Sequence, residues 1–126
     1  MLLDTHAWIW WAASRSSLSA RARKAIEESR RLGVSAISCW EVAMLVRKGR
    51  LDLDREVGSW VARALSLPRI DLVELTPEIA VSAASLDDVP GDPADRIILA
   101  SALAMKAPLV TKDEQLRACK LVKTIW

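Results

Sequence analysis

Five short apolar runs alternate with longer segments of helical pattern, and this alternation is the strongest constraint on the fold. The runs fall at residues 1–3, 34–37, 70–75, 108–111 and 121–125. The helical segments fall at residues 6–13, 20–32, 38–48, 54–67, 77–86, 93–107 and 113–118. Strands joined by helices pair in parallel, and continuously apolar strands are typical of sheets covered on both faces. The sequence therefore predicts an α/β fold with a central parallel sheet.

The helix boundaries are marked by residues that commonly start or stop helices. Gly33 and Gly49 are expected to end the second and third helices, because glycine adopts the left-handed conformation found there. Asp54 is expected to begin the fourth helix, and Pro77 suits the first position of the fifth. No repeat, low-complexity segment or linker interrupts the chain. We therefore expect residues 1–126 to form one domain.

Composition narrows the class of protein. The chain has 126 residues, 52% of them hydrophobic, and a net charge of +2, which is too small to indicate nucleic-acid binding by itself. Cys39 and Cys119 form no CxxC motif and are expected to be buried thiols, and a single histidine argues against a Cys/His zinc site. The chain shows neither a signal peptide nor the ~18-residue apolar run of a membrane span, so we expect a cytoplasmic protein.

Four carboxylates fall at the carboxyl ends of the predicted strands or in the first turn of a helix near them. They are Asp4, Glu41, Asp95 and Asp113. Ligands bind at this edge of an open parallel sheet. Helix capping is the competing explanation, since Asp4 can cap the first helix and "SCWE", residues 38–41, matches a capping box. "DPAD", residues 92–95, and "TKDE", residues 111–114, also resemble helix starts.

Capping accounts for Asp92 but leaves three acids on faces that should be buried. Glu41, Asp95 and Asp4 each share a helix face with apolar residues, and basic side chains nearby are scarce. Converging carboxylates without cations need raised pKa values or a divalent ion. Oxygen ligands without His or Cys favour Mg²⁺ or Mn²⁺. This pattern indicates metal-assisted phosphodiester hydrolysis.

The segments "LLDTHAWIWW", "VSAISCWEVAMLVRKGRL", "GDPADRIILASAL" and "LVTKDEQL", in this order, resemble the PIN-domain ribonucleases. The likeness is strongest to the VapC-type toxins of type II toxin–antitoxin pairs. It implies a three-layer α/β/α domain and an endoribonuclease that uses Mg²⁺ or Mn²⁺. It also implies an RNA substrate such as tRNA or ribosomal RNA, a homodimer, and inhibition by a cognate antitoxin. The histidine that many relatives carry before this acidic stretch is missing from "VPGDPADR".

The resemblance places the family's four acids on Asp4, Glu41, Asp95 and Asp113. We expect Asp4 and Asp95 to bind the metal directly, Asp113 to bind it directly or through water, and Glu41 to act through a water. Asp92 is expected to remain a helix cap.

Other side chains near the predicted site have structural explanations. Arg96 is expected to form an ion pair with a neighbouring acid, and His6 is expected to be structural. "RKGR", residues 47–50, suits the end of an exposed helix or a phosphate contact. Trp10 and Trp11 point about 100° apart on a helix, so at least one should reach an antitoxin or dimer surface, while base stacking is a weaker option.

Two other classes of function compete with the nuclease. A PIN-like module could bind RNA or protein without cutting, although the complete set of acids speaks against it. A phosphatase that uses Asp4 as nucleophile needs a second aspartate two residues later, where this chain has His6.

Overall fold

The sheet of the computed structural model, which describes residues 1–126, has five parallel strands in the order β3-β2-β1-β4-β5. The strands are β1 (Leu2–Leu3), β2 (Leu32–Ser35), β3 (Ile70–Val73), β4 (Leu109–Val110) and β5 (Thr124–Ile125). β1 pairs with β2 on one side and with β4 on the other. The predicted parallel sheet is therefore confirmed, and its short central strand is flanked by neighbours from both halves of the chain.

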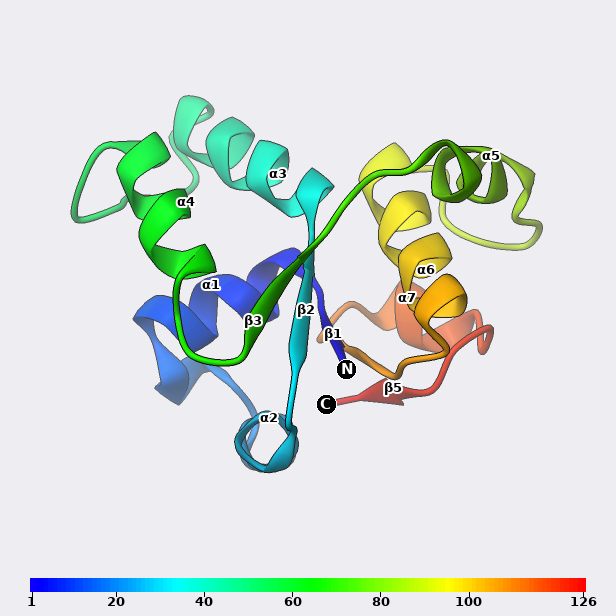
Figure 1. The fold of residues 1–126 in the computed structure, drawn as a ribbon, viewed down its shortest axis with the longest axis horizontal. Coiled ribbons are helices and arrows are strands. Elements are labelled where there is room, and N and C mark those ends of the chain that lie inside the picture. The colour runs from blue at the N-terminus through cyan, green and yellow to red at the C-terminus, as the bar shows by residue number, and fades with distance from the viewer.

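Seven α-helices cover the sheet in two outer layers, as Figure 1 shows. The helices are α1 (Thr5–Ala13), α2 (Ala20–Glu28), α3 (Ala36–Arg47), α4 (Val57–Leu65), α5 (Pro77–Ser85), α6 (Pro93–Met105) and α7 (Glu114–Ala118). In Figure 1 α1 and α4 lie on one side of the strands, and α5, α6 and α7 lie on the other. Ala22 and Ile26 of α2 belong to the same core as α1 and α4. The three-layer α/β/α fold is confirmed.

Alternate residues of the strands supply the two cores. Leu3, Val34 and Val110 are fully buried in the core beneath α1, α2 and α4. Leu2 and Leu109, their neighbours along the chain, are fully buried against α6 and α7. Successive side chains of a strand point to opposite faces, so even a two-residue strand can anchor both layers. The sheet is held in place by this burial rather than by strand length.

Two predicted helix boundaries are wrong. Gly33 does not end a helix, because α2 ends at Glu28 and Gly33 lies inside β2. A Cβ atom on Gly33 would lie 3.0 Å from Leu2 Cδ1 and 3.1 Å from Val73 Cγ2, so the glycine serves close packing rather than a turn. The fourth helix starts at Val57 with Glu56 as its cap, not at Asp54. None of the seven helices has both the length and the apolar composition of a membrane-spanning segment.

Candidate active site

The candidate site lies where the order of the strands reverses. The chain runs from β1 to β2 and β3 on one side, and later returns to β4 and β5 on the other side of β1. Asp4 follows β1 directly, and its N–H donates to the carbonyl of Val110 at the end of β4 (3.0 Å). Loops at such a reversal diverge to opposite faces of the sheet and leave a crevice at the carboxyl ends of the strands.

Asp4 is a buried carboxylate held from two sides. One oxygen accepts a hydrogen bond from the N–H of Ala7 (2.8 Å), which confirms the predicted helix cap, and the other accepts from the Thr111 hydroxyl. Thr111 in turn accepts from the N–H of Asp113 (3.0 Å). Asp4 is only 7% exposed, and burial raises its pKa. The carboxylate is thus fixed to β4 but has no cationic side chain in an ion pair.

Glu41 lies further along its helix than the predicted capping box placed it. α3 begins at Ala36, and its cap is Ser35, whose hydroxyl accepts from the N–H of Ile37 (3.3 Å). Ser38 is fully buried and forms a hydrogen bond with Thr5 (2.9 Å) instead of capping the helix. The Thr5 hydroxyl also forms a hydrogen bond with Glu41. Burial raises the pKa of Glu41, and this hydrogen bond opposes the rise.

Asp92 and Asp95 begin α6 with different surroundings. Asp92 is exposed and accepts from the N–H of Asp95 (3.1 Å), as predicted for a cap. Asp95 is half-buried. Burial, followed by the negative charges of Asp92, Asp113 and other acids, raises the pKa of Asp95 to about 7. No basic side chain forms an ion pair with Asp95.

Asp113 lies at the exposed side of the site. Its carboxylate caps α7 by accepting from the N–H groups of Gln115 (2.8 Å) and Leu116 (3.1 Å). The match of residues 111–114 to a capping box predicted Thr111 as the cap of this helix, and that prediction is wrong because Asp113 is the cap. One hydroxyl instead links the Asp113 backbone to the Asp4 carboxylate.

Arg96 does not form the predicted ion pair. Its guanidinium donates to the backbone carbonyls of Ala83 (3.0 Å), Ala84 (3.2 Å), Leu86 (2.6 Å) and Pro90 (3.4 Å). The last carbonyl groups of a helix lack partners within it, and Arg96 supplies donors to the end of α5 and the loop behind it. The charge next to Asp95 in sequence is thereby directed away from the acids.

The acids line one open pocket of about 440 Å³. Its wall consists of Asp4, Thr5, His6, Trp10, Glu41, Asp92, Asp95, Ile98, Lys112 and Asp113. Five carboxylates therefore share this wall with a single lysine and a histidine. All four predicted site residues are present. Lys112 and Trp10 were not among them, because only the fold places their elements beside Asp4.

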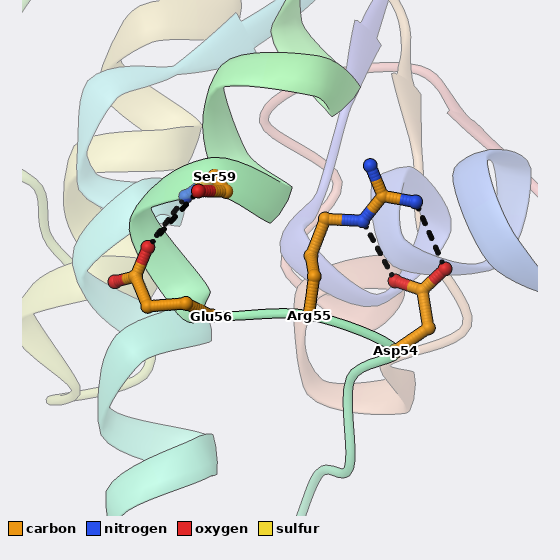
Figure 2. A network of polar contacts seen from close by, with 4 residues as sticks. All are labelled: Asp54, Arg55, Glu56 and Ser59. Carbon is orange, nitrogen blue, oxygen red and sulfur yellow. Dashed lines mark hydrogen bonds and ion pairs between the residues drawn. The ribbon is translucent and has the colours of Figure 1, made fainter.

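At a second pocket acidic side chains have hydrogen-bond donors close to them in the chain. This pocket measures about 410 Å³ and lies between the end of α1 and α4. At its rim Arg55 donates to both carboxylate oxygens of Asp54 (3.0 and 3.1 Å), as Figure 2 shows. Nearby, Glu56 accepts from the N–H of Ser59 (2.9 Å). These acids have donors close along the chain, whereas Asp95 makes no side-chain contact with a base.

The donor chemistry of the acidic pocket fits a hard divalent ion. Carboxylate oxygens, with no cysteine among them, are the ligands of Mg²⁺ and Mn²⁺. As the side chains stand, no three His, Cys, Asp or Glu residues are arranged to hold one ion together. Mg²⁺ retains several waters and is commonly held by one or two carboxylates, so a complete protein cage is not required. The pocket could therefore hold an ion through Asp4 and one or two neighbours.

The sequence also matches a known family and a curated relative. The PIN domain family model matches residues 1–120. Ribonuclease VapC22 of Mycobacterium tuberculosis (strain ATCC 25618 / H37Rv) is 40% identical over 129 aligned positions, which cover 100% of this chain and 98% of the relative.

Solved structures with the same fold include two VapBC structures. VapBC2 from Rickettsia felis, bound to a DNA fragment from its promoter, has a TM-score of 0.69 at 16% identity. That match covers 98% of this chain and 97% of the other. VapBC-1 from nontypeable Haemophilus influenzae has a TM-score of 0.68 at 16% identity, with coverage of 98% and 94%. At this level of identity the structures support the fold alone.

Proposed function

Because the chain belongs to the PIN-domain family, we propose that it is a metal-dependent endoribonuclease and the toxin of a toxin–antitoxin pair. The observation that carries this proposal is the gathering of five carboxylates in one pocket without an arginine. Burial first, and repulsion from the neighbouring acids second, raise the pKa values of Asp4 and Asp95, so the cluster adds nothing to stability by itself. A bound divalent ion would compensate the negative charge of the carboxylates and act on a phosphodiester substrate.

In this proposal each acid has a separate part. Asp4 and Asp95 bind the ion, Asp113 binds it directly or through a water, and Glu41 orients a water. The hydrogen bonds from Thr111 and Ala7 keep Asp4 in a fixed position, which limits reorganisation when an ion binds. When bound, Mg²⁺ or Mn²⁺ would polarise the phosphoryl group and lower the pKa of a bound water.

The proposed partners are RNA, a cognate antitoxin and a second copy of the chain. RNA is proposed because the 40% identical relative is named a ribonuclease, and an antitoxin is proposed because solved structures with the same fold are named as VapBC assemblies. Several large apolar side chains are exposed, among them Trp40 (55%) and Val81 (68%), and could contribute to a protein interface. Trp11 is buried and Trp10 lines the pocket, and the contact of Trp10 with an antitoxin or a second copy of the chain stays a prediction.

A binding module without nuclease activity is the second candidate. The arrangement of the side chains favours it, because no three of them are placed to hold one ion together. It accounts less well for Asp4, a buried carboxyl group that forms no ion pair with a cationic side chain. Cleavage assays separate the two candidates.

The experiment incubates the purified protein with tRNA and ribosomal RNA in EDTA, in Mg²⁺ and in Mn²⁺, and analyses the products on denaturing gels. We expect defined cuts with either ion and none in EDTA. Asp4→Asn and Asp95→Asn should abolish cutting. Glu74→Gln should not, because Glu74 is an exposed acid just after β3 and does not line the pocket. Cleavage that persists in EDTA or in both aspartate variants would rule out this assignment.

A further inference from the structure

One side of the acidic pocket is aromatic and cationic rather than acidic. Trp10 and His6 come from α1, and Lys112 comes from the loop after β4. The Lys112 ammonium lies 5.8 Å from the centre of the Trp10 ring, within the range of a cation–π contact. The ring of Trp126 packs on Trp10 from the chain's C-terminal end, with centroids 5.6 Å apart. Trp10 is therefore supported from within the protein while still lining the pocket.

The other two tryptophans of α1 are buried in the core and do not line the pocket. Trp8 is fully buried and Trp11 is 4% exposed, so both belong to the core. Trp10 is half-buried and shares its helix face with His6, one turn earlier. Six residues separate Trp10 from Asp4, which corresponds to about 9 Å along the helix at 1.5 Å per residue. The indole thus lies beside the acids rather than among them.

The acids alone cannot attract a nucleic acid. Five carboxylates repel a phosphate backbone, and even a bound divalent ion offsets only part of that charge. Aromatic stacking on a base does not depend on net charge, and a single lysine can contact one phosphate. Trp10 offers the largest aromatic surface in the pocket, with the smaller ring of His6 beside it, and Lys112, the one lysine of the lining, is in contact with Trp10.

We propose that Trp10 and Lys112 form a nucleotide subsite at the rim of the pocket. The indole stacks on one unpaired base of the RNA, and the ammonium contacts a phosphate next to it. Base–aromatic stacking tolerates any base, so the subsite selects an unstacked nucleotide rather than a sequence. The choice of RNA as ligand rests on the proposed function, but the subsite is tested by binding, without cleavage.

The test measures the binding of a fluorescein-labelled, unstructured RNA by anisotropy in low salt and EDTA. The RNA is first shortened to the minimum length that keeps full affinity, which fixes its register on the protein, and one series of this RNA carries a single abasic nucleotide at successive positions. Stacking on Trp10 predicts that one abasic position weakens binding by about tenfold and that Trp10→Ala weakens binding to intact RNA by a similar factor. In Trp10→Ala the effect of that abasic position should disappear. Trp10→Phe, which keeps a ring, should retain most of the affinity.

Two controls separate stacking from damage to the fold. Trp40→Ala removes another exposed tryptophan, on α3 and outside the pocket, and should leave binding unchanged. Abasic scanning with the unmodified protein gives an answer even if Trp10→Ala fails to fold. Wild-type protein that does not bind the RNA, or that binds every abasic RNA equally well, would overturn the subsite.

The role of Lys112 is tested separately, through the salt dependence of RNA binding. Lys112→Gln should reduce the slope of log affinity against log salt by about 0.7, the value for one lost phosphate contact on a single strand. Lys123→Gln, an exposed lysine away from the pocket, should leave the slope unchanged. An unaltered slope in Lys112→Gln would refute the phosphate contact. Cleavage without Trp10-dependent binding would refute the subsite alone, and Trp10-dependent binding without cleavage would refute the nuclease alone.

Discussion

Asp95→Asn tests the electrostatics of the pocket through the pH dependence of stability. Burial and neighbouring acids raise the pKa of Asp95 to about 7, against 3.8 for an ordinary aspartate. Between these values the native state holds a proton that the unfolded chain has released. Raising the pH from about 4 to above 7 therefore lowers the free energy of unfolding of the metal-free protein. Asparagine cannot ionise, so the variant lacks this contribution.

The magnitude follows from the shift and the exposure of the side chain. A rise from 3.8 to about 7 would correspond to roughly 4 kcal/mol at 1.36 kcal/mol per unit. Asp95 is only half-buried, so solvent screening reduces the expected effect to about 1–2 kcal/mol. For a chain of this size that equals a rise in melting temperature of about 4–8 °C. We expect Asp95→Asn to be the more stable protein at pH 8 and about equal to wild type at pH 4.

The assay is chemical or thermal unfolding in EDTA at several values between pH 4 and pH 8. The quantity of interest is the difference between variant and wild type, because Asp4 and Glu41 also have raised pKa values and remain in both proteins. Glu74→Gln controls for the loss of one exposed negative charge. A constant difference across the pH range, or a variant that is less stable at pH 8, would refute the electrostatic reasoning.

Two further substitutions test the structure around the site. Arg96→Gln removes the donors to four carbonyl groups at the end of α5 and in the loop behind it. In urea titrations this variant should have a free energy of unfolding about 2–3 kcal/mol lower than wild type. Arg117→Gln, which changes an exposed side chain of α7, should have little effect. Equal effects of the two would contradict the role given to Arg96. Gly33→Val should cost about 1–3 kcal/mol, because even a Cβ atom meets Leu2 and Val73, whereas Gly91→Ala has open space and should be tolerated.

The sheet and its carboxyl edge are predictable because they depend on local composition. Apolar runs between helical segments indicate parallel strands, and Asp4 follows the first run directly. Gly33 is not predictable in the same way. A glycine after a helical pattern usually signals a C-terminal stop, but here the nearby side chains of Leu2 and Val73 require its small size. Contacts of this kind arise only after the strands have paired.

The details of the site depend on contacts that are distant in sequence. Ser35 and Ser38 are both acceptable helix caps, and the choice is settled by the buried hydrogen bond of Ser38 to Thr5, 33 residues away. The local sequence around Arg96 suggests an ion pair, yet the carbonyls of the preceding helix provide more acceptors for a guanidinium. The sequence predicts that Trp10 or Trp11 leaves the core, but which of them does so, and that it lines the acidic pocket, depends on how α1 packs against the sheet.

Calorimetric titration of the metal-free protein with Mn²⁺ is the direct test of the acidic pocket. We expect saturable binding that Mg²⁺ displaces, that Asp4→Asn and Asp95→Asn each weaken strongly, and that Glu74→Gln leaves unaltered. A free Mn²⁺ concentration of about 100 times the Kd should also raise the free energy of unfolding by about 2.7 kcal/mol. If the wild-type protein takes up no ion, or both aspartate variants bind it as tightly as wild type, then these carboxylates do not form a metal centre.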